Sequence, residues 1–183
     1  VTIEKTAISI NVSVTDWTTS DVALTAITVG TPAGQSSGVR TGDVMTVWTG
    51  VDAARTEMAQ FTYNGTAWTT PTPVYWESMN GPQRFYGSIP RQAAYNSTQV
   101  ADNLVASPVV VYPSDGVNFQ LTHPVAMVTV VLKSSDGSIS DADLANMSIV
   151  LPGYVTGGTY DKGVYIPGSG SGDITVQKNV GQN

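Results

Sequence analysis

The sequence predicts an all-β protein built as a β-sandwich, and three observations support that fold class. Hydrophobic residues make up 41% of the 183 residues, while charged residues make up only 12%. Thr, Ser and Val are abundant and there are 18 glycines, which is typical of strands joined by tight turns. Short apolar or alternating runs also recur along the whole chain, separated by turn-forming residues.

The first strand is the clearest. In AISINVSVT, residues 7–15, apolar side chains alternate with small polar ones at a strict period of two, which predicts a half-buried strand. The apolar stripe consists of Ile8, Ile10, Val12 and Val14. VALTAITV at residues 22–29 and DVMTVW at residues 43–48 predict the next two strands, with the turn-rich segment GTPAGQSSG between them.

An Asn-Gly pair predicts a hairpin in FTYNGTAW, residues 61–68. If Asn64-Gly65 is a two-residue loop, Phe61 faces Trp68 on the same side of the ribbon. Such an aromatic pair stabilises a ribbon by about 0.2–1 kcal/mol.

Further strands are expected at PVYW and RFYGSIP, and then in the apolar runs NLVASPVVVYP, VNFQL and PVAMVTVVL. The one helical signal is SISDADLANM, residues 138–147, where Ser140 and Asp143 have the spacing of a capping box. Short strands at MSIVLP, GVYIP and after GSGSGD complete the pattern. We expect two sandwich domains, residues 1–112 and residues 113–183, with the second one incomplete in this chain.

Charge and cysteine content exclude several kinds of partner and site. The formal net charge is −6 and the basic residues are scattered, so nucleic acid is not expected as a partner, because phosphate binding needs clustered Lys and Arg. The chain has no Cys, which removes disulfides and Cys-based zinc sites. No apolar run approaches the roughly 20 residues of a membrane-spanning helix.

His123, the one histidine, lies in QLTHPVAMVTVVL and could be a catalytic base, a metal ligand or a packed ring. Metal sites usually combine several His, Asp or Glu at matched spacing, and the nearest carboxylate in the sequence is Asp115. No nucleophile turn of the G-x-S-x-G type is present. The acids in SSDGSISDADL lack the register of a calcium loop and are expected in caps and turns. A structural ring is therefore favoured for His123, and no catalytic residue, metal or cofactor is predicted.

The tryptophans provide an alternative function. Aromatic side chains at strand ends could form a sugar-stacking platform, which would make the chain a carbohydrate-binding β-sandwich module; packing in the core or at its rim is the favoured interpretation. The residues concerned are Trp17, Trp48, Trp68 and Trp76.

Several segments, taken together, resemble the fimbrillin family, the pilins and pilin-like adhesins of the type V pilus of Gram-negative anaerobes. In chain order they are GDVMTVWTG, FTYNGTAW followed by PVYW, RFYGSIP, DNLVAS, VNFQLTHPVAMVTVVLKSS and DLANMSIVLPGYVTGG. Each segment is degenerate, and the resemblance rests on their order and spacing over residues 42–158.

The resemblance implies transthyretin-like, Greek-key sandwich domains and a non-catalytic fimbrial subunit or adhesin at the cell surface. It also implies an outer-membrane lipoprotein, although the lipidated Cys is missing from this sequence. Maturation at an Arg is implied as well; the usual cleavage signal after the first strand is not evident, and Arg40 is the candidate substitute. The implied partners are other pilus subunits, joined by β-strand exchange, and a host protein or glycan.

The N-terminal strand is the candidate for that exchange. At about 3.3 Å per residue, residues 7–15 span roughly 30 Å, enough to run the length of a sandwich. A terminal strand can leave more readily than a central one, and its loss would expose an apolar groove with unpaired backbone groups. A permanent edge strand that never leaves is the alternative.

Overall fold

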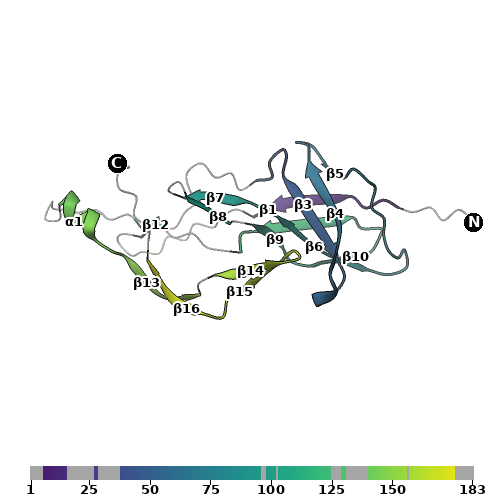
Figure 1. The fold of residues 1–183 in the computed structure, drawn as a ribbon. Helices are drawn as coiled ribbons and strands as arrows, with labels where there is room; N and C mark the ends of the chain where they lie inside the picture. Colours follow the sequence, from purple (N-terminus) through teal and green to yellow (C-terminus); the bar gives the residue numbers. More distant parts are fainter. Residues whose placement is uncertain are drawn as a thin grey trace, which may run out of the picture.

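Strands dominate the fold (Figure 1). The structure is a computed structural model, and it describes residues 6–15, 27–28, 38–95, 98–101, 103–124, 129–130, 140–155 and 157–175. The strands are β1 (Ile10–Val14), β2 (Ile27–Thr28), β3 (Val44–Thr49), β4 (Thr56–Tyr63), β5 (Trp68–Thr69), β6 (Gln83–Ile89), β7 (Gln92–Tyr95), β8 (Thr98–Ala101), β9 (Leu104–Ala106), β10 (Val109–Val111), β11 (Val117–Thr122), β12 (Thr129–Val130), β13 (Val150–Val155), β14 (Gly158–Asp161), β15 (Val164–Pro167) and β16 (Ser171–Thr175). The described residues also include a 3₁₀ turn, η1 (Asp52–Ala54), and an α-helix, α1 (Asp141–Asn146). The predicted all-β class is confirmed, with a sheet arrangement like that of sandwiches and barrels.

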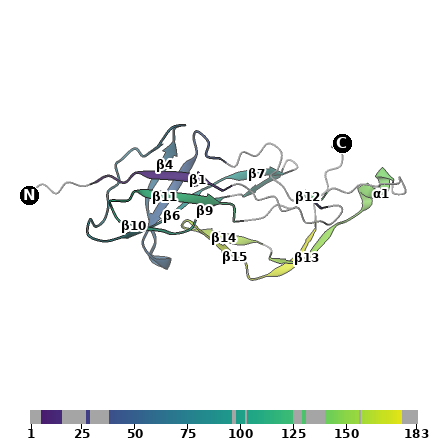
Figure 2. The same cartoon turned by 180° about the vertical axis from the view of Figure 1, so that it is seen from behind.

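One large sheet has the strand order β1-β11-β9-β6-β3-β4-β5, with β10 as a further partner of β6. β1 runs parallel to β11, and the other pairs in this sheet are antiparallel. In both views β3 and β4 cross the direction of β1, β9 and β11, so the sheet folds back on itself (Figures 1 and 2). The other described strands form the pairs β2–β12, β7–β8, β13–β16 and β14–β15.

The hydrophobic core lies inside the folded sheet. In β11 the buried residues Val117, Phe119 and Leu121 alternate with exposed ones, as a strand with one buried face requires. The same cluster includes Ile8, Ile10, Met45, Val47, Phe61, Trp76, Phe85, Ile89, Leu104 and Ala106. Gly87 of β6 lets its neighbours approach closely, because a Cβ there would overlap the Met45 side chain and lie 3.2 Å from the Phe119 ring.

The opposite face of β3 and β6 is covered by the β14–β15 hairpin. Gly163, in the hairpin turn with a φ of +80°, lies against two rings: a Cβ there would be 2.9 Å from Trp48 and 3.0 Å from Tyr86. The Arg55 guanidinium lies 4.9 Å from the centre of the Tyr86 ring and pairs with Asp161 of the hairpin at 2.9 Å. An aromatic contact and an ion pair thus attach this hairpin to the large sheet.

The turn of the β4–β5 hairpin differs from the prediction. Tyr63 lies opposite Trp68, with ring centroids 5.3 Å apart, so the predicted pairing of Phe61 with Trp68 across a two-residue loop is wrong. The reason is the Asn64 side chain. Its Oδ1 accepts hydrogen bonds from two backbone amides further along the turn, which stabilises a longer loop over residues 64–67.

Helix α1 begins as its sequence predicts. The Ser140 Oγ accepts a hydrogen bond from the Asp143 amide at 3.1 Å, and the Asp143 carboxylate accepts one from the Ser140 amide at 3.1 Å. This reciprocal pair is the predicted capping box, which is confirmed. Hydrogen bonds from the Ser140 side chain and amide lower the pKa of Asp143 below its usual value.

The pairing of strands crosses the predicted domain boundary. β11, which follows residue 113, lies in the large sheet with β1 and β9, while β2 near the N-terminus pairs with β12. The division into residues 1–112 and 113–183 stays a prediction. The rest of VALTAITV, residues 22–26 and 29, lies outside the described residues.

A candidate site for strand exchange

β1 forms one end of the large sheet, where the purple arrow lies alongside β11 in Figure 2. Its register with β11 places Ile10 opposite Val117 and Val14 opposite Leu121. Ile8 and Ile10 are buried, with 7% and 5% of their surface exposed, whereas Val12 and Val14 are only half-buried against the core. The predicted apolar stripe therefore faces the core, and its burial decreases from Ile8 toward Val14.

The two edges of β1 are bonded to different extents. Ser9 O accepts a hydrogen bond from Val117 N at 3.4 Å, and Thr15 N donates to Leu121 O at 2.9 Å, so the odd-numbered residues face β11. Since backbone groups alternate between edges, those of Ile10, Val12 and Val14 point to the opposite edge.

Among the described residues, that opposite edge has a partner at its beginning alone. Ile8 N donates to Val74 O at 2.8 Å, and Ala7 forms an isolated bridge with Tyr75. Within the described residues, no strand pairs with the outer edge of β1 from Ile10 to Val14. With respect to the described part of the chain, this row of backbone groups is an open strand edge, a feature that favours strand addition or replacement.

Polar side chains on the exposed face help to fix the register of β1. Asn11 Nδ2 donates to Asn118 Oδ1 at 3.0 Å, and Gln120 Nε2 donates to Thr15 Oγ1 at 2.9 Å. Both contacts are exposed, so each contributes little to stability. Together with the apolar stripe they specify one pairing, because a slip by one residue would turn every apolar side chain to solvent.

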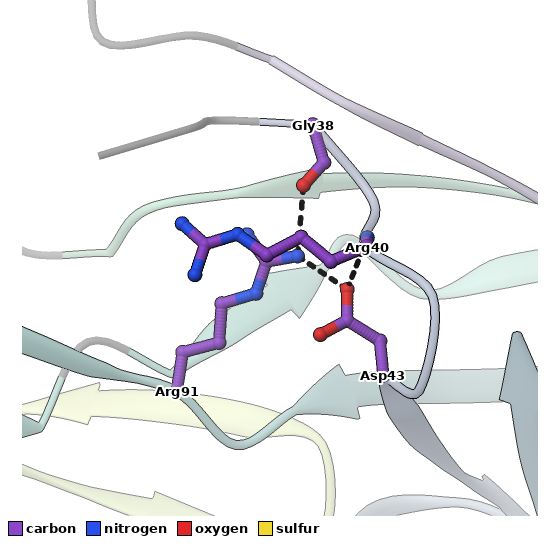
Figure 3. A network of polar contacts seen from close by, with 4 residues as sticks. All are labelled: Gly38, Arg40, Asp43 and Arg91. Carbon is purple, nitrogen blue, oxygen red and sulfur yellow. Dashed lines mark hydrogen bonds and ion pairs between the residues drawn. The ribbon is translucent and has the colours of Figure 1, made fainter. Parts of the chain in front are cut away.

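The candidate cleavage residue Arg40 lies in a tight turn (Figure 3). Asp43 N donates to Arg40 O at 2.9 Å, and Arg40 N donates to the Asp43 carboxylate at 2.8 Å. The Arg91 guanidinium pairs with the same carboxylate and donates to Gly38 O at 2.8 Å. Because proteases bind their substrates as extended chains, cleavage after Arg40 requires this turn to open first.

Sequence reasoning did not find the Arg91–Asp43 pair. The two residues are 48 positions apart, and both side chains are largely buried. An Asp in GVRTGD reads as an ordinary turn residue, and nothing in GSIPRQAA marks Arg91 as its partner. No local signal in the sequence could have identified this pair.

The described tryptophans lie in three separate places. Trp76 is buried edge-on to Phe85 with ring centroids 5.3 Å apart, and Trp68 lies half-buried beside Tyr63. Trp48 lies on the other face of the sheet, under the β14–β15 hairpin. None of the described ring contacts joins two of these tryptophans. The fourth, Trp17, lies outside the described residues.

His123 directly follows β11 and is half-buried. Its side chain or backbone interacts with another group of the protein. Among the described residues, no group of three His, Asp or Glu side chains is arranged to hold a metal ion. Asp136 of the predicted turn lies outside the described part of the chain.

Over the same described part, no helix has the length and apolar character that a membrane span requires.

Comparison of the chain with protein-family models, with curated proteins and with solved structures finds no match.

Proposed function

We propose that this chain is a fimbrial subunit or fimbrillin-like adhesin that assembles by β-strand exchange at β1 and has no catalytic activity. The outer edge of β1, which no described strand pairs, carries the proposal, because a strand held mainly by one neighbour is the element that another subunit can replace. The resemblance of segments over residues 42–158 to fimbrillins supports the same function. Under this proposal the fold is a Greek-key, transthyretin-like sandwich, and the protein acts at the outer membrane, within a fimbrium.

Loss of β1 would create a groove suited to a second strand. The groove floor would be Val117, Phe119 and Leu121, which are all fully buried in the intact sheet. Burying an Ile side chain contributes roughly 1.5–3 kcal/mol, so an empty groove opposite Ile8 and Ile10 is unfavourable in water. An incoming strand with the same alternation would recover this burial and the hydrogen bonds to β11. The replacement of β1 by a donor strand therefore changes the free energy of the protein little at equilibrium.

The burial gradient along β1 indicates where replacement begins. At Ile8 the strand is bonded on both edges, to β11 and to Val74, and its side chain is buried. Near Val14 the described hydrogen bonds reach the β11 edge alone, and the side chain is half-buried. A donor strand is expected to displace β1 from the Val14 end first, because fewer contacts are lost there.

A truncation experiment tests the proposal. Residues 1–16 are removed, and a synthetic peptide of residues 7–15 is added; the control peptide carries Ile10→Asp, which places a charge in the core. We expect the truncated protein to bind the natural peptide or to assemble into fibres, and to ignore the control. If truncation unfolds the protein, refolding is expected only with the natural peptide. Absence of binding, assembly and rescue would leave β1 as a permanent edge strand.

The expected partners are other pilus subunits and a host protein or glycan, with membrane attachment through a lipid anchor alone. The carbohydrate-binding module stays the alternative prediction. A glycan-array screen distinguishes the two functions: tight binding that one Trp→Ala substitution abolishes would favour the module.

A further inference from the structure

The β4–β5 turn contains an arrangement of backbone amides that strand exchange does not use. Asn64 N donates to Ala67 O at 3.1 Å and closes the turn. The Asn64 Oδ1 in turn accepts hydrogen bonds from Thr66 N and from Ala67 N, each at 2.9 Å. Asn64 and Gly65 are both exposed, and Gly65 has a φ of +100°.

Two donors on one carbonyl oxygen make the attached carbon more electrophilic. The arrangement resembles an oxyanion hole, in which fixed N–H groups stabilise the negative charge that develops on the oxygen during nucleophilic attack. The nearest nucleophile along the chain is the Gly65 amide nitrogen, which makes no hydrogen bond to any described residue. Glycine also has no side chain to shield this nitrogen. The turn therefore combines an activated carbonyl, an accessible nucleophile and contact with water.

We propose that Asn64-Gly65 is a site of self-catalysed deamidation. The Gly65 nitrogen attacks Cγ of Asn64 and gives up its proton, so that a new N–Cγ bond closes a five-membered succinimide. The Cγ–Nδ2 bond breaks, and Nδ2 leaves as ammonia with the proton returned through solvent. Water then adds to either succinimide carbonyl and opens the ring to an aspartate or an isoaspartate at position 64. Water is the one co-reactant, and no oxidant or reductant takes part.

The modification would change the neighbouring turn as well. A Cβ on Gly65 would lie 2.9 Å from Thr41 Oγ1, and Gly42 N donates to Tyr63 O at 2.8 Å. The product adds a negative charge at this junction, and isoaspartate also adds one atom to the backbone. The hairpin and the Arg40–Asp43 turn should therefore loosen together as the protein ages. This inference is independent of strand exchange.

The chain provides its own control in Asn80-Gly81, the second of its two Asn-Gly pairs. Both residues of this pair also lie outside the core, with Asn80 exposed and Gly81 half-buried. The Asn80 amide donates to Ser78 Oγ at 3.2 Å, but the Asn80 side chain accepts no hydrogen bond from a described residue. The two pairs thus share their reacting groups and differ in the activation of the carbonyl.

The full-length folded protein is incubated at mildly alkaline pH, and each site is followed by peptide mass spectrometry with isoaspartate-specific detection. We expect Asn64 to react about tenfold faster than Asn80, a modest effect for two oxyanion donors. In urea the turn is lost, and the two rates should converge. A folded protein in which Asn80 reacts as fast as Asn64, or faster, would overturn the proposal.

Removal of one donor gives a second test. Thr66→Pro deletes an N–H that binds the Asn64 Oδ1, and a thermal melt checks that the variant is folded. The reaction at Asn64 should slow severalfold, while the reaction at Asn80 keeps its rate. A faster reaction at Asn64 would mean that the donors protect the side chain, which would overturn the proposal. If the variant does not fold, the proposal is tested by the ratio of the Asn64 and Asn80 reaction rates in the natural protein, measured in the folded state and in urea.

Discussion

Replacing Gly87 by alanine tests the packing of the core most sharply. Gly87 lies on β6 and faces inward, between Met45 of β3 and Phe119 of β11. An added Cβ would overlap the Met45 side chain and lie 3.2 Å from the Phe119 ring, where the optimal separation of two carbons is about 3.5–4.0 Å. Both neighbours are almost completely buried, so the Met45 side chain must change its position within the core to make room for the new methyl group.

The expected cost follows from two opposing effects. Overpacking a well-filled core costs about 1–3 kcal/mol. Reduced freedom of the unfolded chain returns about 0.4–1 kcal/mol when glycine becomes alanine. Gly87→Ala should therefore lower the free energy of unfolding by roughly 1–2 kcal/mol, which corresponds to a melting temperature lower by about 2–8 °C.

Urea unfolding and thermal melts measure this effect. Gly81→Ala is the matched control, because no heavy atom would lie within 4 Å of the new Cβ and stability should hardly change. Adding Met45→Val to Gly87→Ala should give a smaller loss than the sum of the single changes, since the shorter side chain relieves the overlap. If Gly87→Ala is as stable as Gly81→Ala, the close packing of β3, β6 and β11 is refuted.

Three further outcomes are expected. Asp161→Ala should lower stability by about 1 kcal/mol in urea unfolding, because Arg55 is 8% exposed and loses its charge partner; an unchanged midpoint would contradict docking of the β14–β15 hairpin. The capping carboxylate Asp143 has a lowered pKa, so its contribution to the stability of α1 is complete above pH 3.8 and is lost as the pH falls through the pKa of the folded state. The helical circular dichroism signal should decrease over that pH range in the natural protein, but not in Asp143→Asn. A double-mutant cycle on Tyr63 and Trp68 should give a coupling of about 0.5–1 kcal/mol, and zero coupling would refute their pairing.

Local patterns in the sequence predict much of the fold. The alternation in residues 7–15 identifies β1 and the face that it buries, because one side of a half-buried strand must be apolar, and the apolar run VNFQL identifies β11 as a strand. The Ser140–Asp143 spacing likewise identifies the start of α1. In each case the residues that determine the structure are neighbours in the chain.

Pairings between distant segments are not encoded in such patterns. β1 and β11 are more than 100 residues apart, and their alternation is compatible with a parallel or an antiparallel pair. The attachment of Asp161 to Arg55 depends on how the hairpin turn fits against Trp48 and Tyr86, which appears only in three dimensions. The β4–β5 register was mispredicted for a local reason, because the hydrogen bonds of one Asn side chain outweighed the usual preference of Asn-Gly for a two-residue loop.

Hydrogen exchange of the intact protein tests strand exchange at β1 most directly. The amides of Val117, Phe119 and Leu121 face β1. Amides inside the β3–β6 pair lie between central strands, and we expect them to open only when the whole sheet unfolds. We expect the three β11 amides to exchange through a local opening whose free energy is well below that of global unfolding, and Leu121 to open more readily than Val117. Equal opening free energies for the β11 and β3–β6 amides, matching global unfolding, would contradict the assignment of β1 as an exchangeable strand.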